Sequence, residues 1–244
     1  MDETRGPAVD LTGRVAMITG AAGPAGRAVT DALVRAGARV GMVGSNLERV
    51  EALARELGLD GDGWLAVGAD LRDAAKARDA VGAVVERFGR IDVLVHLVGG
   101  WTGGIPASET PDDTIRSMLD QHLWTTVNTV RAVVPGMVAA GFGRIVAVSS
   151  PVVIETPART AAYAVGKAAG ETFLGALARE TATTGVTVNV LRVRTVDAEG
   201  LRDREPGPKT ASWTTPDEIA AAVLYLCSPA AGAVTGARIP LHRS

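Results

Sequence analysis

Three side chains in the middle of the chain have the types and the spacing needed to move a proton to or from an oxygen atom. Tyr163 and Lys167 are four residues apart, one turn along the same face of a predicted helix. An ammonium beside a phenol favours the phenolate, which lowers a pKa that is ordinarily about 10. Ser150 precedes them, just after a predicted strand, where its hydroxyl can hold the same oxygen. The pattern predicts acid–base chemistry on a carbonyl or alcohol, although a Tyr-x-x-x-Lys pair alone is common in exposed helices.

A glycine-rich loop near the start of the chain has the pattern of a phosphate site. Gly20, Gly23 and Gly26 follow an apolar run and precede a helical pattern. Glycines at these places permit a tight turn, the approach of a phosphate and close packing of helix on strand, and the helix start offers unpaired N–H groups. Pro24 offers no N–H, but its fixed φ suits the first turn of a helix. The loop therefore predicts a dinucleotide site, with an ordinary strand–helix turn as the alternative.

The remaining pattern predicts a scaffold that brings these residues together. β-branched runs alternate with longer helical patterns, which is typical of an α/β protein with a doubly wound parallel sheet of about seven strands and helices on both faces, in three layers. Ligands of such sheets bind at the carboxyl ends of the strands. The expected strands are Val15–Thr19, Val40–Val43, Trp64–Ala69, Ile91–Val95, Ile145–Val148, Val186–Val193 and Ile239–Leu241. The expected helices include Leu47–Leu57, Asp112–Ala140, Thr160–Thr183 and Pro216–Leu226.

Composition limits the function classes. The 244 residues are 47% hydrophobic and 21% charged, which fits one domain over residues 11–244 after a disordered tail at 1–10. A net charge of −2 gives no basic surface for nucleic acid. One cysteine, Cys227, excludes an internal disulfide and fits a reducing, cytoplasmic compartment. No apolar run reaches the roughly 18 residues of a membrane span, and the three histidines lack metal-ligand spacing.

Taken together, these motifs resemble the short-chain dehydrogenase/reductase family from Val15 to about Leu241. The resemblance rests on the order and spacing of the glycine loop, Asp70-Leu71, Arg90-Ile91-Asp92-Val93-Leu94-Val95, Ser150, Tyr163, Lys167, Val188-Asn189 and Pro216-Asp217-Glu218. It implies a Rossmann-type fold, an NAD(P) cofactor, hydride transfer at a carbon bearing oxygen, and a homodimer or homotetramer built on the long helices. It also implies that Tyr163 is the general acid/base, that Lys167 lowers the tyrosine pKa and holds the nicotinamide ribose, and that Ser150 steadies the substrate oxygen.

The cofactor choice depends on the end of the second expected strand. An acidic residue there bonds the ribose hydroxyls and repels a 2′-phosphate, but this chain has Gly44-Ser45-Asn46. Ser45 is able to donate to a phosphate, so NADP is favoured over NAD. The loop follows the TGxxGxxG pattern of the family's longer branch, although single-domain members usually carry TGxxxGxG. The predicted cofactor-binding residues are Gly20, Gly23, Pro24, Ala25, Gly26, Ser45, Asp70, Leu71, Leu97, Val98, Gly99, Tyr163, Lys167 and Val196.

Two departures from the family pattern concern asparagines. His96-Leu97-Val98-Gly99 replaces Asn-Asn-Ala-Gly, and the backbone atoms of Leu97 and Val98 remain available to the cofactor. His122 stands where the family has a fourth catalytic residue, an asparagine that holds a water linking the lysine to solvent. Histidine donates, accepts and titrates near neutrality. His122 therefore either takes over this relay or is a helix histidine bonded locally.

Further departures concern the substrate side. Val193-Arg194 replaces the usual Pro-Gly, and Val196 falls where a backbone N–H would meet the nicotinamide carboxamide. Arg194 either faces an acidic substrate group or is a solvated loop residue. Trp101, in a glycine-rich loop, and Trp213 are candidate walls of a substrate pocket. The segment 198–215, normally the substrate lid, is short and polar.

The favoured function is an NAD(P)-dependent oxidoreductase, a ketone reductase acting on a small carbonyl or alcohol without a metal. One alternative is a non-redox enzyme on the same scaffold, a dehydratase, cyclase or isomerase that uses Tyr163 and His122. The other is a non-catalytic dinucleotide-binding regulator. The presence of Ser150, Tyr163 and Lys167 together argues against the regulator, because a pure binder does not need all three.

Overall fold

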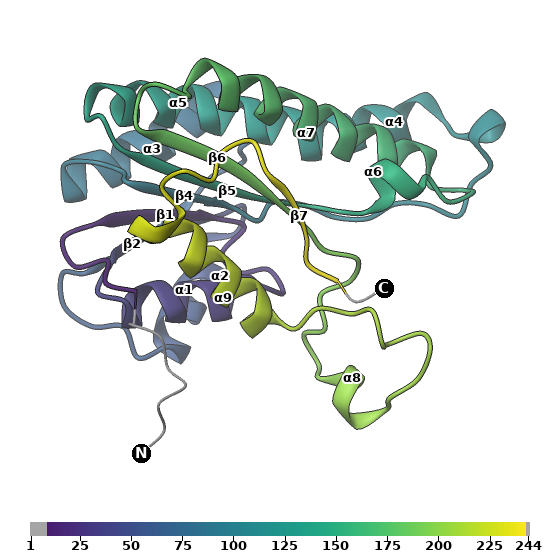
Figure 1. Ribbon diagram of the computed structural model, residues 1–244, viewed down its shortest axis with the longest axis horizontal. Helices are drawn as coiled ribbons and strands as arrows, with labels where there is room; N and C mark the ends of the chain where they lie inside the picture. Colours follow the sequence, from purple (N-terminus) through teal and green to yellow (C-terminus); the bar gives the residue numbers. More distant parts are fainter. Residues whose placement is uncertain (1–8, 243–244) are drawn as a thin grey trace.

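The computed structural model describes residues 9–242, which form one seven-stranded parallel sheet with helices on both faces (Figure 1). The strand order is β3-β2-β1-β4-β5-β6-β7. The strands are β1 Val15–Thr19, β2 Arg39–Gly44, β3 Trp64–Gly68, β4 Val93–His96, β5 Gly143–Ser149, β6 Val186–Arg192 and β7 Arg238–Pro240. This order reverses direction between β1 and β4, so the predicted three-layer, Rossmann-type arrangement is confirmed.

The helices divide between the two faces of the sheet. In Figure 1, α1, α2 and α9 lie below the sheet, and α3, α5 and α7 lie above it. The helices are α1 Gly26–Arg35, α2 Leu47–Glu56, α3 Ala74–Phe88, α4 Asp112–Leu119, α5 Thr125–Ala139, α6 Val152–Glu155, α7 Ala161–Glu180, α8 Leu201–Arg204 and α9 Pro216–Cys227. Short 3₁₀ turns occur at Ala107–Glu109 and Pro229–Ala231.

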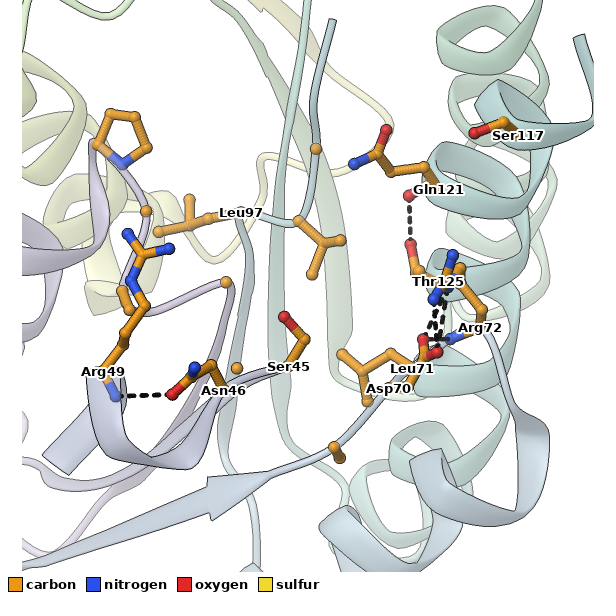
Figure 2. A pocket seen from close by; sticks show the side chains of 18 residues that line it. Ser45, Asn46, Arg49, Asp70, Leu71, Arg72, Leu97, Ser117, Gln121 and Thr125 are labelled. Atoms are coloured by element: carbon orange, nitrogen blue, oxygen red, sulfur yellow. Dashed lines mark hydrogen bonds and ion pairs between the residues drawn. The ribbon is translucent and has the colours of Figure 1, made fainter. Parts of the chain in front are cut away.

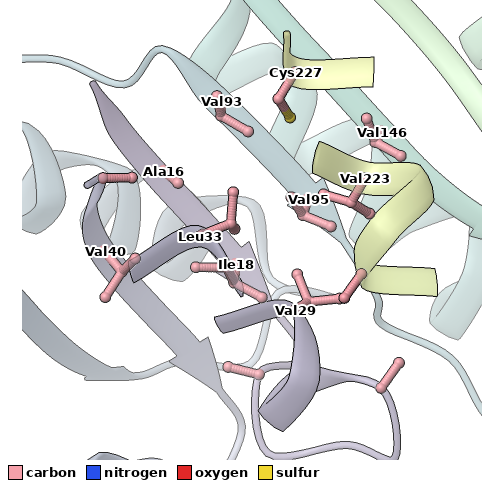
Figure 3. Close-up of a cluster of buried hydrophobic side chains, with 14 of the residues drawn as sticks. Ala16, Ile18, Val29, Leu33, Val40, Val93, Val95, Val146, Val223 and Cys227 are labelled. Carbon is pink, nitrogen blue, oxygen red and sulfur yellow. The ribbon is translucent and has the colours of Figure 1, made fainter. Parts of the chain in front are cut away.

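Two hydrophobic clusters hold the layers together, because the central strands are buried on both faces. On one face, Ile18 and Val95 pack against Val29 and Leu33 of α1 and Val223 of α9 (Figure 3). The other cluster joins the opposite face of the sheet to α3, α5 and α7. Cys227 is a free cysteine buried in the first cluster, where burial raises the pKa of its thiol to about 12. It is a core residue.

Local signals in the sequence set several helix ends. The side chain of Asp73 accepts from two backbone N–H groups at the start of α3, and Thr215 and Glu218 form a capping box at the start of α9. Gly37, with φ +89°, follows the C-cap residue of α1 and ends this helix. The bounds of β1 are as predicted, and those of the other strands differ from the predicted ones by one or two residues, which is the usual ambiguity of element ends.

The predicted helix Asp112–Ala140 is wrong as one element, because a π-helical turn, Asp120–Trp124 (η2), separates α4 from α5. The hydroxyls of Thr125, Thr126 and Thr129 each donate to the carbonyl four residues earlier, which loosens the helical ladder here. Such turns occur often at functional sites. This one carries His122.

Two further expectations concern the ends of the chain and the membrane. Most of the expected tail, residues 1–8, lies outside the described residues. Within residues 9–242, none of the helices has the length and apolar character needed to cross a bilayer.

Candidate active site

The glycine loop between β1 and α1 is shaped by close backbone contacts. Gly20 has φ +72°, and a Cβ there would lie 2.9 Å from the carbonyl carbon of Leu97. At Gly26 a Cβ would lie 1.7 Å from the carbonyl oxygen of Ala21. No side chain fits at either position, so these glycines provide the tight turn and the close helix packing that the sequence predicted. The loop therefore fits a phosphate group against its backbone.

The placement expected for Pro24 is wrong in one respect. Pro24 lies before Ala25, the N-cap residue of α1, so it is not in the first turn of the helix. The reason is that the chain turns twice before the helix begins, with Gly23 N donating to Gly20 O and Gly26 N donating to Gly23 O. Pro24 is exposed at the rim of the cleft and costs the helix no hydrogen bond.

A cleft of about 540 Å³ begins at this loop and follows the carboxyl ends of β1, β2, β3 and β4. Most predicted cofactor residues line it: Gly20, Gly23, Pro24, Ser45, Asp70, Leu71, Leu97, Val98 and Gly99. Ala25 and Gly26 are buried behind the loop and shape it from within. Val196 lies outside the cleft, on the segment after β6, where it forms an isolated bridge with Thr214.

The cleft also contains residues that the sequence reasoning missed. Figure 2 shows Arg49 and Asn46 on one wall and Asp70, Arg72 and Gln121 on the other. Asn46 caps α2 by accepting from Arg49 N, which places the Arg49 side chain one turn into the helix and over the cleft. The Arg49 guanidinium has no hydrogen-bond or ion-pair partner within the described part of the chain. The signal in the sequence that could have identified Arg49 is its position three residues after Asn46, the residue that caps α2.

Asp70 is not a free carboxylate in this cleft. Arg72 Nε donates to Asp70 Oδ1 at 2.9 Å and Arg72 Nη2 to Oδ2 at 2.7 Å. These bonds hold the pKa of Asp70 below its usual value. The nucleotide cleft therefore has a paired carboxylate on one wall and an unpaired guanidinium on the other.

His96, at the end of β4, forms hydrogen bonds with Thr19 of β1 and Thr125 of α5. Thr125 Oγ1 donates to Gln121 O at 2.7 Å, so it must accept from His96 Nε2, at 3.4 Å. His96 Nδ1 then accepts from Thr19 Oγ1 at 2.7 Å. Burial lowers the pKa of His96 to about 3, so the ring is neutral. These hydrogen bonds join the end of β4 to β1 and to the central helix, next to Leu97 and Val98 at the edge of the cleft.

The structure brings Ser150, Tyr163, Lys167 and His122 together. Ser150 follows the end of β5, and Tyr163 and Lys167 come from the first two turns of α7. The rings of His122 and Tyr163 meet edge to face, with centroids 5.4 Å apart. Lys167 Nζ donates to Val148 O at 3.0 Å and lies 6.0 Å from the centroid of the Tyr163 ring. All four predicted catalytic residues therefore share one site.

Two local effects act on the pKa of Tyr163. Burial raises the pKa of Tyr163, and a hydrogen bond with Ser150 counters this. Lys167 is buried as well, which lowers its own pKa to about 8. Its ammonium donates to the Val148 carbonyl, so it acts on the phenol through its charge.

His122 also differs from its expected titration near neutrality. Burial, together with the charge of Lys167, lowers the pKa of His122 to about 3, so the ring is neutral. Its Nε2 lies 3.0 Å from Gly100 O, and because a carbonyl only accepts, Nε2 carries the proton. Nδ1 is then an acceptor, and it is buried without a hydrogen-bond partner among residues 9–242.

The three predicted substrate residues have different surroundings. Trp101 is the most exposed, at 65%. Trp213 is half-buried, and its backbone carbonyl accepts from Arg202 Nη1. Arg194 is paired with Glu155 of α6, so it is not a freely solvated arginine.

The segment 198–215, expected as a lid, carries the short helix α8. Among the described residues, no three His, Cys, Asp or Glu side chains gather as metal ligands.

Comparison with known proteins identifies the family. The family model described as short chain dehydrogenase matches residues 14–208. The chain belongs to this family. It is 35% identical to the (2S)-[(R)-hydroxy(phenyl)methyl]succinyl-CoA dehydrogenase subunit BbsC of Thauera aromatica, over 92% of this chain and 91% of the relative. It is also 35% identical to a D-threitol dehydrogenase of Mycolicibacterium smegmatis, over 93% and 90%.

A solved structure agrees over almost the whole chain. A short-chain type dehydrogenase/reductase from Mycobacterium ulcerans matches with a TM-score of 0.87 and 25% identity, covering 96% of this chain and 90% of that one. The protein is therefore a nicotinamide-dependent oxidoreductase that acts on small molecules. The two sequence relatives are named for an aryl-substituted thioester and a polyol, so they agree on the reaction type and differ in the substrate.

Proposed function

We propose that this short-chain dehydrogenase/reductase is an NADPH-dependent ketone reductase in which Tyr163 gives a proton to the carbonyl oxygen. The observation that supports the proposal is the position of Gly99 between the nucleotide cleft and the catalytic side chains. Gly99 lines the nucleotide cleft, and a Cβ there would lie 3.4 Å from both Lys167 Nζ and His122 Cε1. The cleft thus opens directly onto the catalytic group. When bound, the reduced nicotinamide would supply the hydride that the carbonyl carbon accepts.

The protonation state of Tyr163 favours the reductive direction. Because burial raises its pKa, the phenol keeps its proton at neutral pH and is an acid ready to donate. Ser150, bonded to the phenol, holds the carbonyl oxygen beside it. The Lys167 ammonium stabilises the phenolate that remains after the proton leaves. The test is to follow the absorbance of NADPH and the formation of alcohol with a panel of ketones.

We propose further that His122 holds a water that links Lys167 to solvent, and that solvent replaces the proton lost from Tyr163 by way of this water and Lys167. A cavity of about 20 Å³, room for one water, is lined by His122, Lys167 and Ser149. Both His122 Nδ1 and Ser149 Oγ are buried without partners in the described chain, and each is able to bond a water there. His122 acts in this proposal as a neutral acceptor, in place of the family's asparagine.

The pH dependence of reduction follows from the lowered pKa values of Lys167 and His122. The ammonium of Lys167 is present below its pKa of about 8 and is lost above it. We expect kcat for reduction to stay level between about pH 5 and pH 7, because His122 remains neutral there, and to fall above about pH 8. His122→Asn should lower kcat and leave the midpoint unchanged. An inflection near pH 6 that disappears in His122→Asn would mean that His122 titrates during turnover.

The preference for NADPH is supported by Arg49 and Ser45 together. Both line the cleft beside the start of α2, where Asn46 already caps the helix. The Arg49 guanidinium has no partner in the described residues, and none of the cleft residues offers an unpaired carboxylate. A 2′-phosphate would bond the guanidinium and the Ser45 hydroxyl, and the N-terminus of α2 adds a favourable dipole.

Replacing the unpaired arginine tests this preference. Arg49→Gln is expected to weaken NADPH binding about ten-fold and to leave NADH binding unchanged, because only NADPH has the extra phosphate. The measurement is a fluorescence titration that reads energy transfer from tryptophan to the reduced nicotinamide. Arg55→Gln, which removes an equal charge from the last turn of α2, is the matched control. Equal losses for both cofactors would refute the role of Arg49.

We also place this enzyme in the cytoplasm as a homodimer or homotetramer. Trp124, Val138 and Val165, on η2, α5 and α7, are large hydrophobic side chains that are 44%, 39% and 48% exposed. These helices are the ones expected to form the subunit interface, and contact between copies would cover the side chains. Light scattering coupled to size-exclusion chromatography tests the assembly.

A further inference from the structure

A bidentate ion pair, Glu155–Arg194, lies beside the catalytic serine and has no part in the chemistry proposed above. Arg194 follows β6, and Val193 N donates to Ser149 O at 3.0 Å, so the chain after β6 runs next to the segment that carries Ser150. Glu155 is the last residue of α6, which begins two residues after Ser150. The ion pair therefore joins the two segments that flank the reacting side chains.

The pair has the geometry with which a guanidinium recognises a carboxylate. Arg194 Nη1 donates to Glu155 Oε2 at 2.8 Å, and Nη2 donates to Oε1, so the two planar groups meet fork to fork. The side chains are 37% and 38% exposed, so water reaches both. Exposed pairs stabilise a fold only slightly. A second carboxylate can therefore replace Glu155 at little cost to the protein.

Charged groups that act on the pair, and one on the loop that follows α6, favour an anion. The hydrogen bonds from Arg194 lower the pKa of Glu155, and His242, near the end of the chain, adds to this effect. Arg159, on the loop between α6 and α7, donates to Gly104 O and has no carboxylate partner in the described residues. Asp197 is turned away, accepting from the backbone of α8. If Glu155 swings aside, the Arg194 guanidinium is left without a carboxylate partner in the described residues.

Two large exposed apolar side chains lie on α6 and on the loop bonded to the segment after α6. Ile154, next to Glu155, and Trp101 are each 65% exposed. The loop of Trp101 is bonded to the loop after α6, because Gly104 N donates to Arg159 O at 2.8 Å. An apolar ring or chain resting on these side chains would remove them from water.

We propose that Arg194 is a specificity-determining residue that binds a carboxylate on the ketone substrate, with Glu155 holding the guanidinium in place until the substrate replaces it. This rests on the proposed ketone reductase function. The substrate class is then a keto acid in which an apolar ring or chain separates the carbonyl from the carboxylate. Glu155 itself is the carboxylate already seated on the guanidinium, which is why a carboxylate is favoured over other anions.

The test compares matched acids and esters. The probes are para-acetylbenzoate and an oxocyclohexane carboxylate, each alongside its methyl ester, with NADPH as reductant. We expect the wild type to favour each acid over its ester by about ten-fold in kcat/KM. Arg194→Gln should bring this ratio to about one with the ester rate unchanged, and Glu155→Gln should raise kcat/KM for the acids alone. Arg204→Gln, which removes an equal charge from the exposed helix α8, is the control.

A binding measurement separates this inference from the proposed function. Calorimetry of para-acetylbenzoate with the enzyme saturated with NADP⁺ requires no turnover. Binding that depends on Arg194, without reduction of any probe, would support the inference and overturn the reductase function. Reduction of acid and ester at equal rates, unaffected by Arg194→Gln, would overturn the inference and leave the reductase function in place. Absence of both binding and reduction would overturn both.

Discussion

Tyr163→Phe is expected to lower kcat for ketone reduction by on the order of a thousand-fold, because it removes the proton donor and leaves the rest of the site in place. The ring still meets His122 edge to face, and Lys167 keeps its bond to Val148 O. NADPH binding should therefore remain within about three-fold of the wild type. The measurement combines steady-state kinetics with a fluorescence titration of the same preparation.

The second tyrosine provides the control for this experiment. Tyr225, on α9, is 50% exposed and lies outside the candidate site, so Tyr225→Phe should behave as the wild type. A Tyr163→Phe enzyme that retains a tenth or more of its activity would show that another group donates the proton. Loss of cofactor binding in the same variant would mean that the phenol is needed to build the site.

Gly26→Ala is expected to weaken NADPH binding by on the order of a hundred-fold, the second largest effect. The added methyl group would lie 1.7 Å from Ala21 O, so the loop or the start of α1 has to move. Either movement displaces the backbone groups that face the phosphates. Binding is measured by titration, and circular dichroism shows whether the fold survives.

Gly82→Ala is the matched control, because a Cβ at Gly82 meets nothing within 4 Å. Gly82 lies inside α3, where alanine favours the helix by about 1 kcal/mol. This variant should bind NADPH as the wild type does and unfold at a slightly higher temperature. Normal binding by Gly26→Ala in a folded protein would show that the cofactor does not rest on this loop.

The parts of the structure that depend on local pattern could be predicted from the sequence. Strands and helices alternate in short units, and each unit carries its own burial signal, so β1 was predicted with its observed bounds. The spacing of Tyr163 and Lys167 is also local, because helix geometry alone places them on one face. The glycine loop could be predicted for the same reason, since its three glycines lie within seven consecutive residues.

Features that depend on packing could not be predicted. The segment Asp120–Trp124 contains no glycine or proline that would mark a break in the helix, so the π-helical turn that positions His122 could not be predicted. Desolvation lowers the pKa of Lys167 and His122, and it arises from neighbours that are distant in sequence. Glu155 and Arg194 are likewise on different elements, and only the fold brings them together.

The most direct test of the central claim is the ratio of alcohol formed to NADPH consumed by the wild-type enzyme. Absorbance gives the loss of the reduced nicotinamide, and chromatography of the same samples gives the alcohol. A redox reaction in which Tyr163 supplies the proton predicts one alcohol for each NADPH. Conversion of a substrate while the nicotinamide absorbance stays constant would contradict the claim and identify a non-redox reaction on this scaffold.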